Sequence, residues 1–112
     1  MGVYIIQAGD PGPVKIGWCK DSYPKKRIAV LQVGCPEELE ILYLIHPCAR
    51  TFEGYLHKMF EKHRIRGEWF TYSQEIKDFI KWHSNLQRDV DALKRRRKQQ
   101  RIEEAEERNF VD

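Results

Sequence analysis

A glutamate and a histidine four residues apart, Glu53 and His57, are the pair in this 112-residue chain whose types and spacing best allow joint chemistry. Residues four apart on a helix lie one above the other on the same face. Glu53 stands beside a stripe of large apolar residues, where a carboxylate is costly unless it is paired, hydrated or bound to a metal. His57 can orient a water or hold a phosphate oxygen. An ordinary surface contact has the same spacing, so the pair needs further partners before it indicates a site.

Three other residues are candidates for such partners. Tyr4 has an ordinary pKa of about 10, so it acts as a base near neutral pH only if a cation or a metal stabilises its phenolate. Lys15 is such a cation, on a strand that we expect to pair with the strand of Tyr4. Arg27, beside Lys25 and Lys26, has the planar guanidinium that can hold a phosphate through two hydrogen bonds. Simple packing of the tyrosine and a solvated basic face are the alternative interpretations.

The elements that position these residues follow from apolar patterns and from breakers. Residues 3 to 8 and residues 14 to 18 predict two strands, joined as a hairpin across a Gly-Asp-Pro-Gly-Pro segment. Asp21 and Ser22 offer an N-cap for a first helix, and Gly34 offers its C-terminal cap. Tyr4 and Lys15 therefore belong to the hairpin, and Arg27 to the helix that follows it.

The second half of the chain predicts one more strand and two more helices. Residues 39 to 45 suit a strand, and residues 49 to 65 suit a helix that stops near Gly67. Glu68, Trp69 and Phe70 then form an aromatic cluster. From residue 74 onward, apolar residues at alternating steps of three and four predict one long helix with a short coiled-coil-like stripe.

Composition limits the class of protein. The chain carries 20 Lys and Arg against 17 Asp and Glu, a net charge of +3 that permits a polyanionic partner without requiring one. Its three cysteines are odd in number and widely spaced, which argues against a disulfide framework and favours a reducing compartment. No apolar run has the length of a membrane span, so we expect an intracellular, cytoplasmic protein without membrane contact. A zinc site can be drawn, although its residues lack paired ligand spacing: Cys48, His46, His57 and His63.

The order and spacing of five motifs resemble those of the GIY-YIG endonuclease superfamily, in particular its phage-borne branch with a Lys-Ile-Gly second motif and a closing Glu-Trp-Phe. The motifs are Gly2-Val3-Tyr4, Lys15-Ile16-Gly17, Arg27, Glu53 with His57, and Glu68-Trp69-Phe70. The resemblance implies an α/β (α+β) fold, in which a small three-stranded antiparallel sheet is flanked by helices in the order β-β-α-β-α. The nuclease-like domain would be residues 1–72, and the long charged helix would be residues 73–112.

The resemblance also implies an activity and roles for the site residues. The protein would be a metal-dependent endonuclease that hydrolyses phosphodiester bonds in DNA with one divalent ion, Mg²⁺ or Mn²⁺. Glu53 would bind the metal, Tyr4 would take the proton of the attacking water, and Arg27 would stabilise charge on the phosphate. His57 would position water or phosphate. Lys15 replaces a tyrosine of the usual second motif and adds a charge suited to lowering the pKa of Tyr4 or to touching a phosphate.

Double-stranded DNA is the expected partner. Lys25, Lys26 and Arg27 are expected to contact phosphates, and a basic run in the long helix is expected to add affinity without reading sequence. That run, which can also be simply a solvated helix face, comprises Lys94, Arg95, Arg96, Arg97 and Lys98.

Two other functions stay open at this point. One is a nucleic-acid-binding or assembly module that has the same fold but no catalysis. The other is an interaction protein whose long helix associates with itself or with a protein partner. The family asparagine that many members carry late in the core has no clear counterpart here, and Glu68-Trp69-Phe70 stands in its place.

Overall fold

The computed structural model of the chain describes residues 1–20 and 24–109. The chain divides into two compact units, Met1–Lys77 and Asp78–Asp112. The first unit is an α+β structure built on one antiparallel sheet. It contains all five residues for which we expect a catalytic role.

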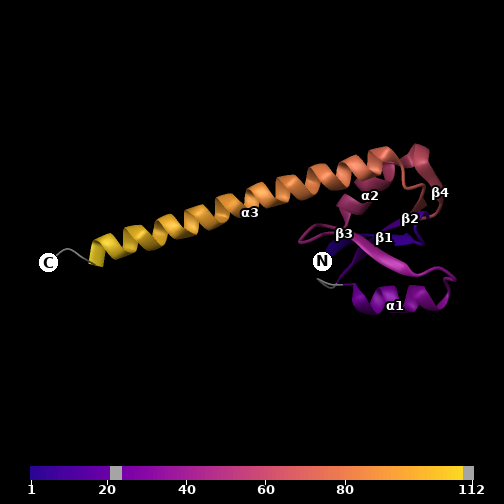
Figure 1. The fold of residues 1–112 in the computed structure, drawn as a ribbon, viewed down its shortest axis with the longest axis horizontal. Helices are drawn as coiled ribbons and strands as arrows, with labels where there is room; N and C mark the ends of the chain where they lie inside the picture. The colour runs from indigo at the N-terminus through magenta and orange to yellow at the C-terminus, as the bar shows by residue number, and fades with distance from the viewer. Residues whose placement is uncertain (21–23, 110–112) are drawn as a thin grey trace. The chain divides into compact units, whose positions relative to one another are not determined.

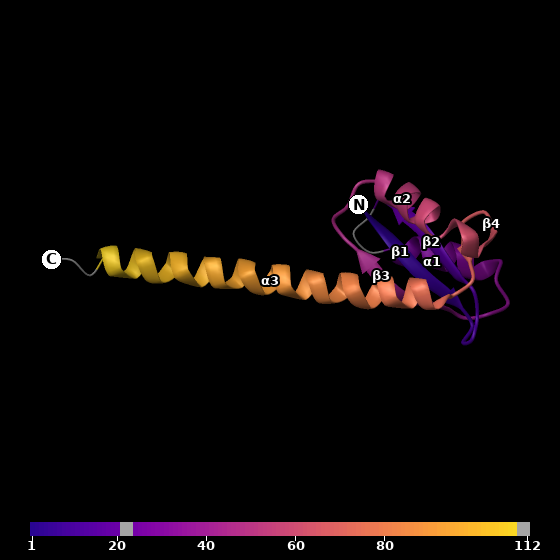
Figure 2. The ribbon, with the colours of Figure 1, turned by 90° about the horizontal axis from the view of Figure 1, so that it is seen from above.

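Three strands form the main part of the sheet. Strand β1 (Gly2–Ala8) pairs with β2 (Val14–Cys19) as the predicted hairpin, with Tyr4 opposite Gly17. On its other edge, β1 pairs antiparallel with β3 (Leu39–Ile45). The N-terminus lies beside the loop that leads from β3 to the next helix (Figure 2), where the backbone N–H of Cys48 donates to the carbonyl of Met1.

Two short strands extend the sheet beyond β2, so the expected three-stranded sheet is wrong. Strands β4 (Arg64–Arg66) and β5 (Trp69–Phe70) form a small hairpin, and the strand order is β3-β1-β2-β5-β4 among the described residues. Gly67 makes the tight turn between them at a φ of 57°, which glycine adopts without a steric penalty. Trp69 pairs with Lys15, so the aromatic cluster expected from the sequence is an extra strand beside the second motif.

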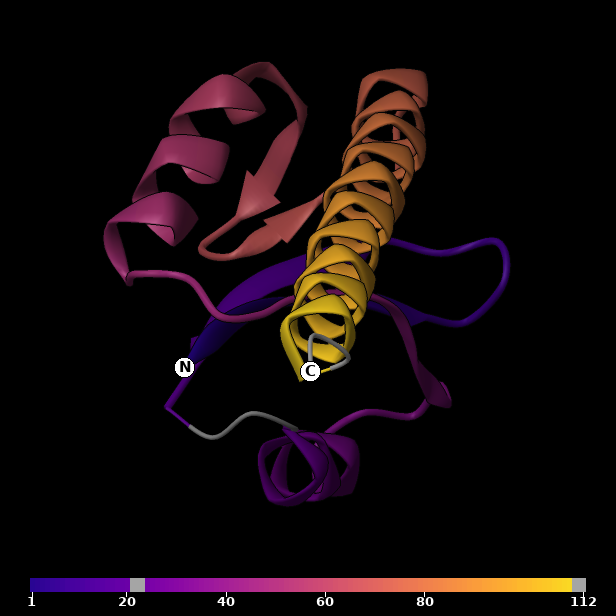
Figure 3. The same ribbon diagram turned by 90° about the vertical axis from the view of Figure 1, so that its left-hand side faces the viewer.

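Two helices cover opposite faces of this sheet, as Figures 1 and 3 show. Helix α1 (Lys25–Val33) packs Ile28 and Leu31 against the face that carries Tyr4 and Ile6. Helix α2 (Thr51–Met59) lies on the other face. Because both faces are covered, every residue of β1 is buried, which accounts for its nearly continuous apolar sequence.

Helix α1 ends at the predicted glycine and is then tied to β3. The expected N-cap residues, Asp21 and Ser22, lie outside the described residues. At the other end, the backbone N–H of Gly34 donates to the carbonyl of Leu31 over 3.3 Å. The side-chain amide of Gln32 donates to the Glu37 carbonyl over 2.8 Å, and its oxygen accepts from the backbone N–H of Leu39 over 2.8 Å. This one side chain therefore fixes the connection between α1 and β3.

Helix α2 is shorter than the sequence predicts, because it ends at Met59 instead of near residue 65. Phe60 leaves the helix at a φ of −103° and is buried. The chain continues as a short 3₁₀ turn, η1 (Glu61–His63), and enters β4. The burial of Phe60 and the pairing of residues 64–66 with β5 override the local preference for a continued helix.

The long helix predicted from residue 74 is present as α3 (Gln74–Asn109). Its first turn belongs to the first compact unit, where Ile76 is fully buried. In the second unit, Leu86, Val90 and Leu93 are exposed on the helix, and their association with a partner stays a prediction. None of the described helices has the length and apolar character needed to cross a membrane. The domain boundary expected after residue 72 also stays a prediction.

Candidate active site

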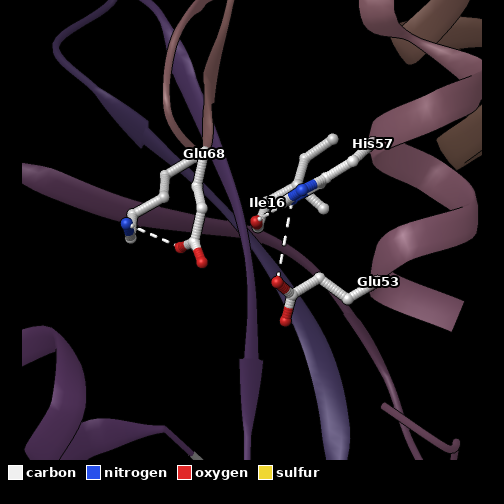
Figure 4. A network of polar contacts seen from close by, with 5 residues as sticks. Ile16, Glu53, His57 and Glu68 are labelled. Atoms are coloured by element: carbon white, nitrogen blue, oxygen red, sulfur yellow. Dashed lines mark hydrogen bonds and ion pairs between the residues drawn. The ribbon is translucent and has the colours of Figure 1, made fainter. Parts of the chain in front are cut away.

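Helix α2 presents Glu53 and His57 to strand β2 (Figure 4). The buried Leu56 anchors the helix, and His57 lies against Phe70 with ring centroids 5.2 Å apart. His57 Nε2 is 2.7 Å from the carbonyl oxygen of Ile16 and 3.9 Å from Glu53 Oε1. As the donor to that carbonyl, Nε2 ties α2 to β2. A contact between His57 and a water or a phosphate would therefore have to come from Nδ1.

We expect His57→Ala to destabilise the protein by about 1–2 kcal/mol, because it removes this hydrogen bond and the ring contact. Urea denaturation measures the loss of free energy of unfolding. His46→Ala is the matched control, because His46 is exposed and none of the described interactions depends on its ring. Equal stability of His57→Ala and wild type would contradict the tie between α2 and β2.

A second carboxylate, that of Glu68 in the turn before β5, lies near Glu53. Its Oε2 forms an ion pair of 2.8 Å with Lys15 Nζ, and Lys15 also lies over the Trp69 ring. Figure 4 shows the carboxylates of Glu53 and Glu68 on either side of β2. Burial, followed by the nearby charge of Glu68, raises the pKa of Glu53, while His57 acts in the opposite direction. The site thus holds two neighbouring carboxylates, one of which is balanced by a lysine.

Tyr4 projects from the opposite strand of the hairpin onto Gly17. Its ring is buried, and a Cβ atom on Gly17 would lie only 2.3 Å from the phenol oxygen. Among the described residues this oxygen has no hydrogen bond of good geometry. It nevertheless lies close enough to the Arg27 guanidinium to raise the pKa of Arg27, first through hydrogen bonding and then through charge. The glycine of the second motif therefore makes the space that the tyrosine of the first motif occupies.

The five expected catalytic residues thus gather around β2. Lys15 faces Ile6 in the hairpin register, which makes it a diagonal neighbour of Tyr4, and its ion pair is with Glu68. Arg27 also feels the charge of Glu68, which raises its pKa further. Glu68 therefore interacts electrostatically with Lys15 and Arg27 and also with Glu53.

The expected phosphate-binding lysines are placed differently from one another. Lys26 lines a hollow together with Arg27, whereas the adjacent Lys25 lines a separate hollow with Ile28 and Leu39. The basic run of the long helix is exposed and belongs to the second unit. Its contribution to DNA binding stays a prediction.

The donor set at the site suits a hard divalent cation with few protein ligands. No group of three or more histidine, cysteine, aspartate or glutamate side chains is arranged for a metal within the described residues, so the zinc site drawn from the sequence is not formed there. Mg²⁺ commonly binds through one or two carboxylates and completes its shell with waters and substrate phosphates. Glu53 and Glu68 supply such carboxylates, and a cation would offset both the burial and the neighbouring charge of Glu68 that raise the pKa of Glu53.

Sequence reasoning gave Glu68 no chemical role and overlooked Arg50 entirely. Glu68 was assigned to a core-closing motif, and its partner Lys15 lies 53 positions earlier, so only the β2–β5 pairing brings the two together. Arg50 lies 5.5 Å from the ring centroid of Trp18 and lowers the pKa of Glu53. Its position just before the helix that carries Glu53 indicates that it lies near that carboxylate.

Comparison with known proteins gives one match. A family model described as the T5orf172 domain matches residues 1–86, which is most of the chain and includes the five expected catalytic residues but not the basic run of the long helix. The chain has no match among curated proteins or among solved structures.

Proposed function

The chain belongs to the T5orf172 domain family, which is associated with phage and homing-endonuclease-like proteins of GIY-YIG-like fold, and on this premise we propose that it is a metal-dependent DNA endonuclease. The reaction would be hydrolysis of a phosphodiester bond with one Mg²⁺ or Mn²⁺ ion. The observation that carries the proposal is the half-buried Glu53, whose pKa is raised first by burial and then by the nearby carboxylate of Glu68. Burial together with a like-charged neighbour shifts carboxyl pKa values in this way at many catalytic and cation-binding sites.

The side chains support distinct steps of this reaction. Glu53 would hold the metal with Glu68 beside it, and the bound ion would supply Lewis-acid stabilisation of the scissile phosphate. Tyr4 would accept the proton of the attacking water, and its phenol lies next to the guanidinium of Arg27. Arg27 remains charged and would stabilise the negative charge that develops on the phosphate.

Lys15 and His57 would act as positioning residues. Lys15 holds Glu68 through their ion pair, and His57 holds α2 over β2 through the Ile16 carbonyl. Both interactions are within the protein and need no substrate. They would therefore keep the two carboxylates in place before a metal or DNA arrives.

Nicking of supercoiled plasmid tests the proposal. We expect wild-type protein to nick plasmid with Mg²⁺ or Mn²⁺ and to be inactive with chelator. Tyr4→Phe should lower the nicking rate by about 100- to 10,000-fold, the range for removal of a general base. The variant retains the ring that fills the space over Gly17, so its fold should be unchanged by circular dichroism.

Tyr43→Phe is the matched control, because it also removes a phenol oxygen but lies on β3, where no expected catalytic residue is found. It should nick plasmid at the wild-type rate. A protein that binds DNA but does not nick it with either metal would instead be a binding module of the same fold. Activity that survives Tyr4→Phe would contradict the role of the phenol.

A further inference from the structure

A basic hollow lies next to the site, between the end of β2, helix α1 and the residue that precedes α2. It is an open depression with a volume of about 470 Å³. Four of its lining residues are cationic, and none of the described lining residues is acidic. The cations are Lys20, Lys26, Arg27 and Arg50.

The two arginines connect this hollow to Tyr4 and to Glu53. Arg27 lines the hollow and also reaches the phenol of Tyr4. Arg50, which lines it too, accepts a hydrogen bond at its backbone carbonyl from the backbone N–H of Glu53 over 3.1 Å. Trp18 forms part of the wall and holds Arg50 in a cation–π contact of 5.5 Å. A polyanion in the hollow would therefore lie beside both Tyr4 and Glu53.

We propose that this hollow is the track along which one nucleic-acid strand runs from the scissile phosphate, with its phosphates against Lys26 and Arg50. The choice of ligand rests on the proposed function, since the phosphodiester backbone is the polyanion that the neighbouring site would cut. Phosphate contacts of this kind position a nucleic acid without reading its bases. The track thus confers affinity and orientation.

The two adjacent lysines of α1 provide a matched test. Lys25 and Lys26 are both exposed and carry the same charge, but successive helix positions point in different directions, and only Lys26 lines this hollow. The experiment is fluorescence anisotropy of a labelled DNA duplex, and of one of its single strands, titrated with the full chain in chelator over a range of salt concentrations. Whichever binds more tightly, the duplex or the single strand, is the form of nucleic acid that the track accepts.

We expect Lys26→Ala to weaken binding about 3- to 10-fold and to reduce the salt slope by about 0.9, the value for one lost phosphate contact. Lys25, which the sequence alone also predicts as a phosphate contact, lines a separate hollow, so Lys25→Ala should weaken binding clearly less than Lys26→Ala. Arg50→Ala, on the opposite wall, should weaken binding at least as much as Lys26→Ala. Equal losses of DNA affinity in the two lysine variants, or wild-type DNA affinity in Arg50→Ala, would contradict the proposed track.

Binding and nicking separate this proposal from the proposed function. A protein with the expected difference between Lys25→Ala and Lys26→Ala that fails to nick plasmid would contradict the nuclease and support the track. A metal-dependent nuclease whose two lysine variants bind equally well would contradict the track and leave the nuclease in place.

Discussion

Glu53→Gln is expected to lower metal-dependent nicking at least about 1,000-fold. The substitution removes the charge that would hold the metal, and the metal contributes several kcal/mol to stabilisation of the transition state, where each 1.4 kcal/mol is a factor of ten in rate. The amide has nearly the same shape as the carboxyl, so α2 should keep its place on the sheet. Initial rates of plasmid nicking with Mg²⁺ measure the loss.

Metal binding gives this variant a second measurement that does not depend on activity. We expect Mn²⁺ binding, followed by electron paramagnetic resonance, to weaken strongly in Glu53→Gln. Glu61→Gln is the control, because Glu61 is an exposed acid two residues beyond α2 and outside the site. Nicking and Mn²⁺ binding at wild-type levels in Glu53→Gln would refute the assignment of Glu53 as the metal ligand.

Gly17→Ala is expected to destabilise the protein by about 1–3 kcal/mol, the usual cost of overpacking a filled core. The added methyl group would meet the phenol of Tyr4 at 2.3 Å, so the ring or one strand of the hairpin must move. The free energy of unfolding in urea measures the effect. Nicking should fall as well, because the displaced ring carries the hydroxyl that would act as the base.

The change of Gly54 to alanine should have the opposite effect on the free energy of unfolding. Gly54 lies in α2 with no atom within 4 Å of an added Cβ, and alanine favours a helix over glycine by about 1 kcal/mol. We therefore expect Gly54→Ala to stabilise the protein. Wild-type stability of Gly17→Ala would mean that the phenol does not set the requirement for glycine at position 17.

The parts of the fold that the sequence predicted are those fixed by local patterns. The β1–β2 hairpin follows from two apolar runs around a cluster of glycine and proline, and β3 follows from a third run. The long helix α3 follows from its apolar spacing, even though most of its residues are exposed. In each case the information lies within the element itself.

The parts that were missed depend on distant pairing. Strand β5 has only two residues and forms because Trp69 and Phe70 pair with β2. That same pairing brings Glu68 to Lys15, so neither the fifth strand nor the second carboxylate could be inferred from nearby residues. The early end of α2 is a related case, since Arg64, which lies inside the predicted helix, pairs with Phe70 of β5.

The candidate site shows the same division. Tyr4, Arg27 and Glu53 were identified through motif order, and their gathering around β2 is what the resemblance implies. The hollow beside them was not foreseen, because adjacent lysines look equivalent in a sequence and differ only once the helix is placed on the sheet.

The ion pair between Lys15 and Glu68 has a consequence for how such proteins diverge. Since each charge is held by the other, loss of the lysine alone would leave two neighbouring carboxylates without their cation, and loss of the glutamate alone would release the lysine. The two positions should therefore be replaced together in the course of evolution. An alignment of relatives should show covariation between the first residue of the Lys-Ile-Gly motif and the first residue of Glu-Trp-Phe, and independent variation would show that the pairing is dispensable.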